Sequence, residues 1–257
     1  MQARLLAIVN AYRQVHYNGE QRIHYQNDEM KQVWKTLSEV ILAVSLLMGC
    51  TARVAERTSA SPLVEEIPLP TPTLKGMMSL EETLALRHSV RSFTGDPLTL
   101  VEIGQLLWAA QGITRDWGGR TAPSAGALYP LEVYVATADG LYHYMPQGHK
   151  VRIESTADLR EALWAAGLKQ DAIRQAPAVF VITAVYARTE SKYGARAERY
   201  VELEAGHAAQ NLLLQAVALG LGGVPIGAFH DDQVQSVLSL PADHTPLYLI
   251  PVGHPQE

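Results

Sequence analysis

The longest helical pattern in the sequence runs from Ala195 to Leu219. Apolar residues recur there at intervals of three and four positions, which is the spacing of one face of an α-helix. The stretch contains no proline and only one glycine, Gly206, and Gly220 follows it directly. Because glycine commonly ends a helix in a left-handed turn, we predict a helix over 195–219. Its last two turns are apolar on nearly all sides, so we expect them to be deeply buried.

Small residues dominate the segment after this helix, where Gly222, Gly223, Pro225 and Gly227 occur close together. Backbone that carries no side chains can approach a flat ligand closely. Alternatively, the glycines only form a tight turn between the helix and a strand. The pattern of residues leaves both interpretations open.

Two shorter helices are marked by their own start signals. Ser79 and Glu82 fit the pattern S-x-x-E, and Thr99 and Glu102 fit T-x-x-E. Each pair predicts a capping box, in which the two side chains satisfy free amides of the first helical turn. We therefore predict helices over 80–88 and 100–111.

Alternating or continuous apolar positions predict five strands, at 131–136, 141–144, 151–154, 178–186 and 246–252. Asp139-Gly140 is a typical hairpin turn between the first two. Two more helices are expected at 158–166 and 231–238, the second capped by Asp231. Since strands and helices do not alternate strictly, the predicted fold class is α+β.

The N-terminal quarter has the composition of an export signal and a tether. Residues 1–29 are polar and are predicted to lie outside the fold. Residues 30–50 combine two lysines, an apolar run over 40–48 and the box Leu-Met-Gly-Cys that ends at Cys50. This is the plan of a secretory signal, and the run is too short to span a membrane, which takes about 20 residues.

The box resembles a bacterial lipoprotein signal, which implies a lipid on Cys50 and translation from Met30. Proline and serine over 51–73 then predict a linker without regular structure, so the folded domain is assigned to 74–257. This reading makes the protein an exported, membrane-tethered lipoprotein on the periplasmic side. The alternative is a cytoplasmic protein in which 30–50 is an amphipathic helix with a buried cysteine.

Composition excludes several classes of function. The net charge is −5 and the sequence pI is about 6.0, without a basic patch, so nucleic acid is not an expected partner. A single cysteine excludes an intrachain disulfide and a cysteine-based zinc site. Glu202, Glu204 and His207 lie near one another on the predicted long helix. No second Glu-x-x-His occurs in the chain, so we interpret them as a polar cluster and predict no metal.

Two arginines and two serines lie close together in the stretch RHSVRSF, residues 87–93. Arg87 and Arg91 carry permanent charge and forked donors, which suit a phosphate group. The alternative is a solvated helix end, where Arg87 and His88 offset the helix dipole.

Together, five stretches resemble the FMN-dependent nitroreductase superfamily and, within it, the SagB-type dehydrogenases. In chain order they are RHSVRSF (87–93), TAPSAGALYPLEVYV (121–135), KYGARAERY (192–200), LEAGHAAQNLLLQAVALGLGGVPIGAF (203–229) and LIPVGHP (249–255). The resemblance implies a nitroreductase-like fold: a mainly antiparallel sheet flanked by helices, in an obligate homodimer with two FMN molecules at the interface. It further implies a hydride transfer between the flavin and a small organic or peptide substrate.

The resemblance also assigns cofactor-binding residues. Residues expected at the phosphate and ribityl end are Arg87, Ser89 and Arg91. Residues expected along the flavin ring are Pro123, Ser124, Ala125 and Gly126 on one side, and Gly222, Gly223, Pro225, Ile226 and Gly227 on another. Gln210 and Asn211 are expected to contact the flavin or the partner subunit. Relatives often continue with basic residues after the closing stretch, and here only His254 is in a position to replace them.

Lys192-Tyr193 resembles a pair that the azoline-oxidising members use to remove a proton from the substrate. Both residues are therefore candidate catalytic bases. The alternative is a surface pair at the start of the long helix. At the level of function, the alternatives to a general oxidoreductase are an azoline dehydrogenase of peptide maturation and a flavin-binding module without catalysis.

Overall fold

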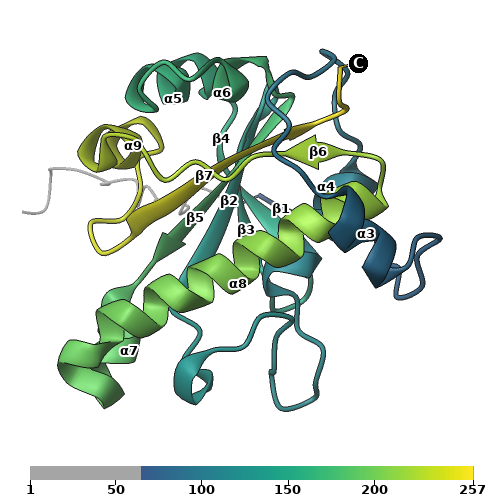
Figure 1. Ribbon diagram of the computed structural model, residues 1–257. Helices are drawn as coiled ribbons and strands as arrows, with labels where there is room; N and C mark the ends of the chain where they lie inside the picture. Colours follow the sequence, from purple (N-terminus) through teal and green to yellow (C-terminus); the bar gives the residue numbers. More distant parts are fainter. Residues whose placement is uncertain (1–64, 257) are drawn as a thin grey trace, which may run out of the picture. The chain divides into compact units, whose positions relative to one another are not determined.

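Seven antiparallel strands form the central sheet of the computed structural model, which describes residues 65–256 (Figure 1). The order across the sheet is β1-β4-β3-β2-β5-β7-β6, and every ladder is antiparallel. The strands are β1 (Glu66–Pro68), β2 (Leu131–Thr137), β3 (Gly140–Met145), β4 (Lys150–Ser155), β5 (Ala178–Ala184), β6 (Gly222–Gly223) and β7 (Thr245–Gly253). All seven residues of β5 are buried, as expected for a central strand with both faces covered.

Helices cover both faces of this sheet. α4 (Leu100–Gln111) and α8 (Ala197–Ala218) pack with one set of buried strand residues, and α3 (Leu80–Leu86) lies beside α8. α5 (Arg160–Ala166), α6 (Asp171–Gln175) and α9 (Asp231–Val237) cover the other face. Alternate residues of β2 divide between the two cores, with Val133 and Val135 in the first, and Tyr134 and Ala136 in the second. In Figure 1, α8 crosses the sheet diagonally.

Most predicted elements are confirmed, including both capping boxes of α3 and α4. The end of α8 is also confirmed, because Gly220 has φ +74° and the Leu221 amide returns to the carbonyl of Ala216. Other boundaries were wrong. The helix predicted over 80–88 ends at Leu86, and Asp231 is the first residue of α9, whose cap position is His230.

The strand predicted over 178–186 also ends early, because the chain turns into a helix there. α7 (Tyr186–Tyr193) follows β5, and a short 3₁₀ turn, η2 (Gly194–Arg196), joins α7 to α8. The predicted long helix over 195–219 therefore begins at Ala197. Neither α6 nor α7 was predicted.

The linker predicted over 51–73 was wrong in its second half. Glu66–Pro68 forms β1 at the edge of the sheet, where Ile67 pairs with Val151. The next residue, Leu69, is buried, and its amide donates to the carbonyl of His149. Prolines are tolerated here because an edge strand needs hydrogen bonds on one side only. Extension 1–29, signal 30–50, Cys50 and the start of the linker lie outside the described residues.

The predicted deep burial of the last turns of α8 holds for only one face. Leu212, Leu213 and Ala216 are buried, whereas Leu214 and Leu219 line an open groove of about 560 Å³. α3 and α4 form the other walls of this groove. Of the side chains that line it, Met77, Leu80 and Val101 are large, apolar and exposed, and Leu84 and Leu86 of α3 are exposed as well. Within residues 65–256, no helix has the length and apolar character needed to cross a bilayer.

Candidate functional site

Two segments that are distant in sequence meet the predicted phosphate-binding stretch. Ser89 forms a parallel bridge with Gly223, and the Val90 amide donates to the Gly223 carbonyl over 3.1 Å. On the other side, the Thr94 amide donates to the carbonyl of His254 over 2.9 Å. We call residues 87–94, 222–223 and 253–256 the arginine cluster. It holds Arg87, Ser89 and Arg91 on a backbone that is fixed at both ends.

Both arginines of this cluster are available for a ligand. Arg87 is half-buried at the end of α3, and Arg91 is exposed. Neither forms a salt bridge with any residue between 65 and 256. Two unpaired guanidinium groups on a fixed backbone are suited to bind a phosphate dianion. The structure also places the backbone of His254 beside this stretch.

The buried glycines of the cluster have a packing role. A Cβ on Gly222 would lie 2.5 Å from the Val90 side chain, and one on Gly223 would lie 2.9 Å from the Pro251 carbonyl. Their small size therefore serves the contact between β6 and its neighbours, as in the turn interpretation of this segment. Ile226 is buried as well, while Pro225 and Gly227 are exposed. Of the five residues predicted here, only these last two offer their surface to a ligand.

A second cluster joins the loop 120–129 to the end of α7. Gly126 lies in the 3₁₀ turn η1 (Ala125–Ala127) with φ +64°. A Cβ at this position would lie 2.9 Å from Lys192 Nζ and 2.9 Å from Tyr193 Oη. The structure therefore brings together two sets of residues that the sequence assigned separately, the ring-binding loop and the candidate catalytic pair.

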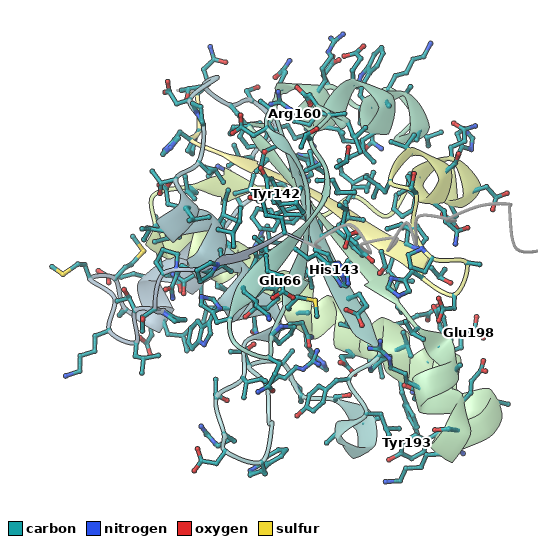
Figure 2. The ribbon with its side chains drawn as sticks, turned by 180° about the vertical axis from the view of Figure 1, so that it is seen from behind. Glu66, Tyr142, His143, Arg160, Tyr193 and Glu198 are labelled. Carbon is teal, nitrogen blue, oxygen red and sulfur yellow. The ribbon has the colours of Figure 1, made fainter. Side chains whose placement is uncertain are left out.

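The catalytic pair does not lie where the sequence placed it. Lys192 and Tyr193 end α7, and η2, which begins at Gly194, separates them from α8, so they are not at the start of the long helix. Tyr193 packs edge-on against Tyr200 of α8, with ring centroids 5.0 Å apart. Lys192 Nζ lies 5.4 Å from the centre of the Tyr193 ring. Figure 2 shows Tyr193 at the end of α7, at the opposite end of the molecule from Arg160.

Replacing Gly126 with alanine should destabilise the protein and displace the pair. An L-residue in the left-handed region costs about 1–2 kcal/mol, and the new methyl group would push the ends of Lys192 and Tyr193 away. Urea unfolding measures the loss of stability. Gly95→Ala is the matched control, because a Cβ there meets nothing within 4 Å. Equal stability of the two variants would contradict the strained, left-handed backbone at Gly126.

A buried carboxyl group that was not predicted as a site residue lies beneath the loop. Glu204 on α8 is 2% exposed, and its Oε1 atom has no hydrogen-bond partner among the described residues. Burial raises the pKa of Glu204 to about 7, against the opposing effects of Ser124 and Arg120. Glu202 and His207 are exposed, so the three residues do not form the single polar cluster that was predicted. No group of three possible metal ligands occurs in residues 65–256.

A second polar network anchors α7 to the sheet. Glu132 on β2 accepts hydrogen bonds from Arg188 of α7 at 2.5 Å and from His143 of β3 at 2.8 Å. Arg188 also donates to the Tyr129 carbonyl over 3.1 Å. Figure 2 shows His143 within the sheet. The network ties the helix that ends in Lys192 and Tyr193 to the strand that follows the loop.

Glu132 should make the protein sensitive to acid. Burial alone would raise its pKa, but the bonds from His143 and Arg188 outweigh burial and lower the pKa of Glu132 to about 2. A carboxyl group whose pKa is lower in the folded protein than in the unfolded chain stabilises the fold at pH values above the unfolded pKa, near 4.5. This stabilisation is lost as the pH falls from 4.5 toward 2. At pH 7 the ionised Glu132 contributes about 3 kcal/mol to the free energy of unfolding.

Glu132→Gln should therefore be less stable than the unaltered protein at pH 7, by about 2–3 kcal/mol, since the amide keeps part of the hydrogen bonding. The difference should shrink below pH 4.5 and vanish near pH 2. Urea unfolding between pH 2 and 7 measures it. Glu161→Gln, at an exposed position of α5, is the control. A difference that stays constant with pH would show that the charge of Glu132 contributes nothing.

The remaining predicted residues lie elsewhere on α8. Asn211 is half-buried and lines the groove between α3, α4 and α8, and Gln210 is exposed. Another cavity of about 320 Å³ lies between β1, β3 and the start of α4. It contains no predicted site residue, and the Arg160 guanidinium on its wall is already paired with Asp158 at 2.6 Å.

Comparison with known proteins is consistent with this geometry. The Methanocaldococcus jannaschii protein MJ1384, a nitroreductase by name, is 44% identical over 182 residues, or 68% of this chain and 91% of that protein. The trifolitoxin-processing protein TfxB of Rhizobium leguminosarum bv. trifolii is 30% identical over 132 residues, or 47% of this chain and 35% of TfxB. A crystal structure from Ralstonia eutropha JMP134, titled as a nitroreductase, is 35% identical with a TM-score of 0.68, over 75% of this chain and 90% of that one.

A model of the nitroreductase family matches residues 84–254, from α3 to the arginine cluster at the C-terminal end. The matched range includes the loop 120–129, the end of α7, the arginine cluster up to His254, and six of the seven strands. The predicted nitroreductase-like fold, with its mainly antiparallel sheet between helices, is confirmed. The chain therefore belongs to the nitroreductase family of oxidoreductases.

Proposed function

We propose that this protein is an FMN-dependent oxidoreductase of the SagB type. The observation that carries the proposal is the arginine cluster, where two unpaired guanidinium groups lie on backbone held by Gly223 and by the C-terminal segment. In a family fold that resembles known flavoenzymes, this is the chemistry required by the phosphate of a flavin mononucleotide. FMN would supply the hydride transfer, which no amino-acid side chain can perform.

The residues present fit such a group at both of its ends. Arg87, Ser89 and Arg91 would hold the phosphate. The loop with Pro123 and Gly126 presents backbone and small side chains, which suits contact with a flat ring.

Lys192 and Tyr193 would act on the substrate as bases. A base placed beside the ring can remove a proton from the substrate carbon or nitrogen as the hydride departs. The contact of both side chains with Gly126 supports this role, because it places them at the loop assigned to the ring. Tyr200 would hold the Tyr193 ring in orientation through its edge-on contact.

A specific substrate class is the second part of the proposal. The match to TfxB, a trifolitoxin-processing protein by name, favours a peptide azoline as the substrate over a nitro compound. Oxidation of an azoline to an azole removes a hydride and a proton from adjacent atoms. That stoichiometry requires one base per turnover, which the Lys192-Tyr193 pair would provide.

The proposal includes a homodimer. Leu80 of α3 and Val101 of α4 are exposed at the groove along α8, and exposed apolar side chains that gather at one place are typical of a protein interface. The arginine cluster and the loop 120–129 lie at different ends of α8. The arginine cluster includes Gly222 and Gly223, which follow the C-terminus of α8, and the loop lies beside its N-terminal half. In a dimer, the loop 120–129 of one subunit would complete the site at the arginine cluster of the other.

An absorption spectrum of the purified protein tests the proposed function. We expect a flavin spectrum that dithionite bleaches and air restores, with one FMN per chain. A thiazoline-containing peptide should bleach the same band under anaerobic conditions. A colourless protein that takes up no added FMN would contradict flavin dependence, whereas a flavoprotein that the peptide leaves oxidised would contradict the substrate class alone.

A further inference from the structure

Helix α7, with the residue that caps its start, lies along the segment 126–130 and contacts it at three levels. The contacts are the Val185 amide to the Pro130 carbonyl at 2.8 Å, Arg188 Nη1 to the Tyr129 carbonyl at 3.1 Å, and the ends of Lys192 and Tyr193 at Gly126. The helix therefore runs in the opposite direction to the segment, and the two are in register. The place of the catalytic pair, at the last level, depends on the two levels before it.

Arg188 makes the charged contact in this series. Its guanidinium is a fork, in which Nη1 donates to the Tyr129 carbonyl over 3.1 Å and Nη2 donates to Glu132 Oε1 over 2.5 Å. Glu132 also accepts a hydrogen bond from His143 of β3 at 2.8 Å, so its carboxylate is fixed to the sheet. Because the donors of a guanidinium have a fixed planar geometry, the two bonds together restrict where Arg188 can lie. Arg188 thus joins α7 to the loop and to the sheet at once.

The position of Arg188 on α7 determines the position of Lys192. The two residues are four apart within the helix Tyr186–Tyr193, and side chains with this spacing lie on the same face of an α-helix. A rotation or a slide of α7 that breaks the fork of Arg188 would therefore carry Lys192 away from Gly126 as well. Tyr193, the next residue along, would move with it.

The loop needs an anchor from outside, because its backbone is strained. Ala127 and Tyr129 have φ +54° and +47°, in the left-handed region that residues other than glycine rarely occupy. Such a conformation persists only where surrounding contacts hold it. Within the loop, the Tyr129 amide donates to Ser124 Oγ over 2.9 Å, and the Arg120 amide donates to Tyr129 Oη over 3.2 Å. Arg188 adds a bond from outside the loop, to the carbonyl of the strained Tyr129.

We propose that Arg188 is a positioning residue for the catalytic pair: its forked bonds set the register of α7 against the loop 120–129 and so place Lys192 and Tyr193 at Gly126. Arg188 acts through the helix and the loop, and it takes no part in the proton transfer itself. Its effect on catalysis rests on the proposed function, whereas the register of helix and loop does not.

The chain offers a matched control for this arginine. Arg160, the first residue of α5, donates from Nη1 to the Ala176 carbonyl over 3.1 Å and from Nη2 to Asp158 over 2.6 Å. These are nearly the bonds of Arg188, and Figure 2 shows Arg160 at the opposite end of the molecule from Tyr193. Loss of Arg160 should therefore cost a similar amount of stability without moving the catalytic pair.

Stopped-flow reduction of the flavin-loaded protein by a thiazoline-containing peptide tests the catalytic effect. Arg188→Ala should lower the limiting rate at saturating peptide by about 10²-fold, the cost of misplacing a reacting group by about 1 Å, and should change the half-saturating concentration little. Arg188→Lys keeps the charge but lacks the fork, so it should recover only part of the rate. Arg160→Ala should reduce at the rate of the unaltered protein. A full rate in Arg188→Ala, full recovery in Arg188→Lys, or an equal loss in Arg160→Ala would overturn the proposal.

Hydrogen exchange of the full chain, measured by mass spectrometry, tests the register without turnover. In Arg188→Ala, peptides that cover 120–130 and 186–193 should lose about tenfold in protection, because a hydrogen bond from a charged group is removed from both segments. In Arg160→Ala the same peptides should keep their protection. Unchanged protection in Arg188→Ala would overturn the proposal even if the rate falls.

The two measurements separate this proposal from the proposed function. A protein that binds no flavin, or whose flavin the peptide leaves oxidised, would contradict the proposed function, and exchange would still decide whether Arg188 holds the register. If Arg188→Ala does not fold, Arg188→Lys supplies both readouts. A lysine variant with the rate and the protection of the unaltered protein would then show that charge alone is sufficient and that the fork has no role.

Discussion

Replacing Arg87 and Arg91 together with alanine is expected to release FMN, with a loss of affinity of roughly 10²- to 10⁴-fold. Hydrogen bonds to charged groups contribute about 1.5–3 kcal/mol each, and both arginines lack another partner among residues 65–256. The fold should survive, because Arg91 is exposed and Arg87 only half-buried. Val90 lies between the two arginines in sequence and packs against Gly222, and it is unchanged in this variant.

Flavin retained through gel filtration, and titration of the apoprotein with FMN, measure this loss. The matched control is the double variant Lys169→Ala and Arg174→Ala, which removes the same charge beside Trp164, far from the arginine cluster in sequence. The control should keep its flavin. Full FMN occupancy in the Arg87 and Arg91 double variant would show that the phosphate is bound elsewhere.

Local patterns in the sequence were sufficient to predict most of the fold. The periodicity of α8, the capping boxes at Ser79 and Thr99, and the turn at Asp139 each depend on neighbours within one or two helical turns. Such signals are contained in a short window of sequence. They predict the helix but not how deeply it is buried. α3 was therefore predicted correctly as a helix, whereas the exposure of its leucines could not be predicted.

The errors have a common physical origin in contacts between distant residues. α7 was missed because Val185 and Tyr186 extend the apolar run of β5, whereas the bond from Arg188 to Glu132 that holds the helix joins residues distant in sequence. β1 was missed because its stability comes from pairing with β4. Glu204 has the periodicity of a helix residue, and nothing near it in sequence indicates that its carboxyl will be buried.

The candidate site was predictable as a set of parts but not as an arrangement. The resemblance to a family supplied the ring-binding loop and the Lys192-Tyr193 pair as separate motifs. Their contact at Gly126 is a property of the fold alone. For Gly222 and Gly223 the sequence suggested a ligand contact that the structure does not require. Gly222 packs against Val90 and Gly223 against Pro251, so packing alone explains why both residues are glycine.

Flavin reduction by the physiological substrate should slow by roughly 10²- to 10⁴-fold when Lys192 is replaced by alanine or Tyr193 by phenylalanine. This is the usual contribution of a general base. The expectation rests on the position of both side-chain ends at Gly126, beside the loop assigned to the flavin ring. Because neither residue is fully buried, the flavin spectrum and the oligomeric state should not change.

Stopped-flow absorbance under anaerobic conditions measures the rate, and two comparisons isolate the proton transfer. Reduction by dithionite requires no base and should be as fast in both variants as in the unaltered protein. Tyr186→Phe, at the other end of α7, is the control for loss of a hydroxyl from the same helix. If both variants reduce normally with the true substrate, the pair has a structural role, and the edge-on contact of Tyr193 with Tyr200 explains its position without chemistry. If only one variant is slow, that residue is the base and the other orients the substrate.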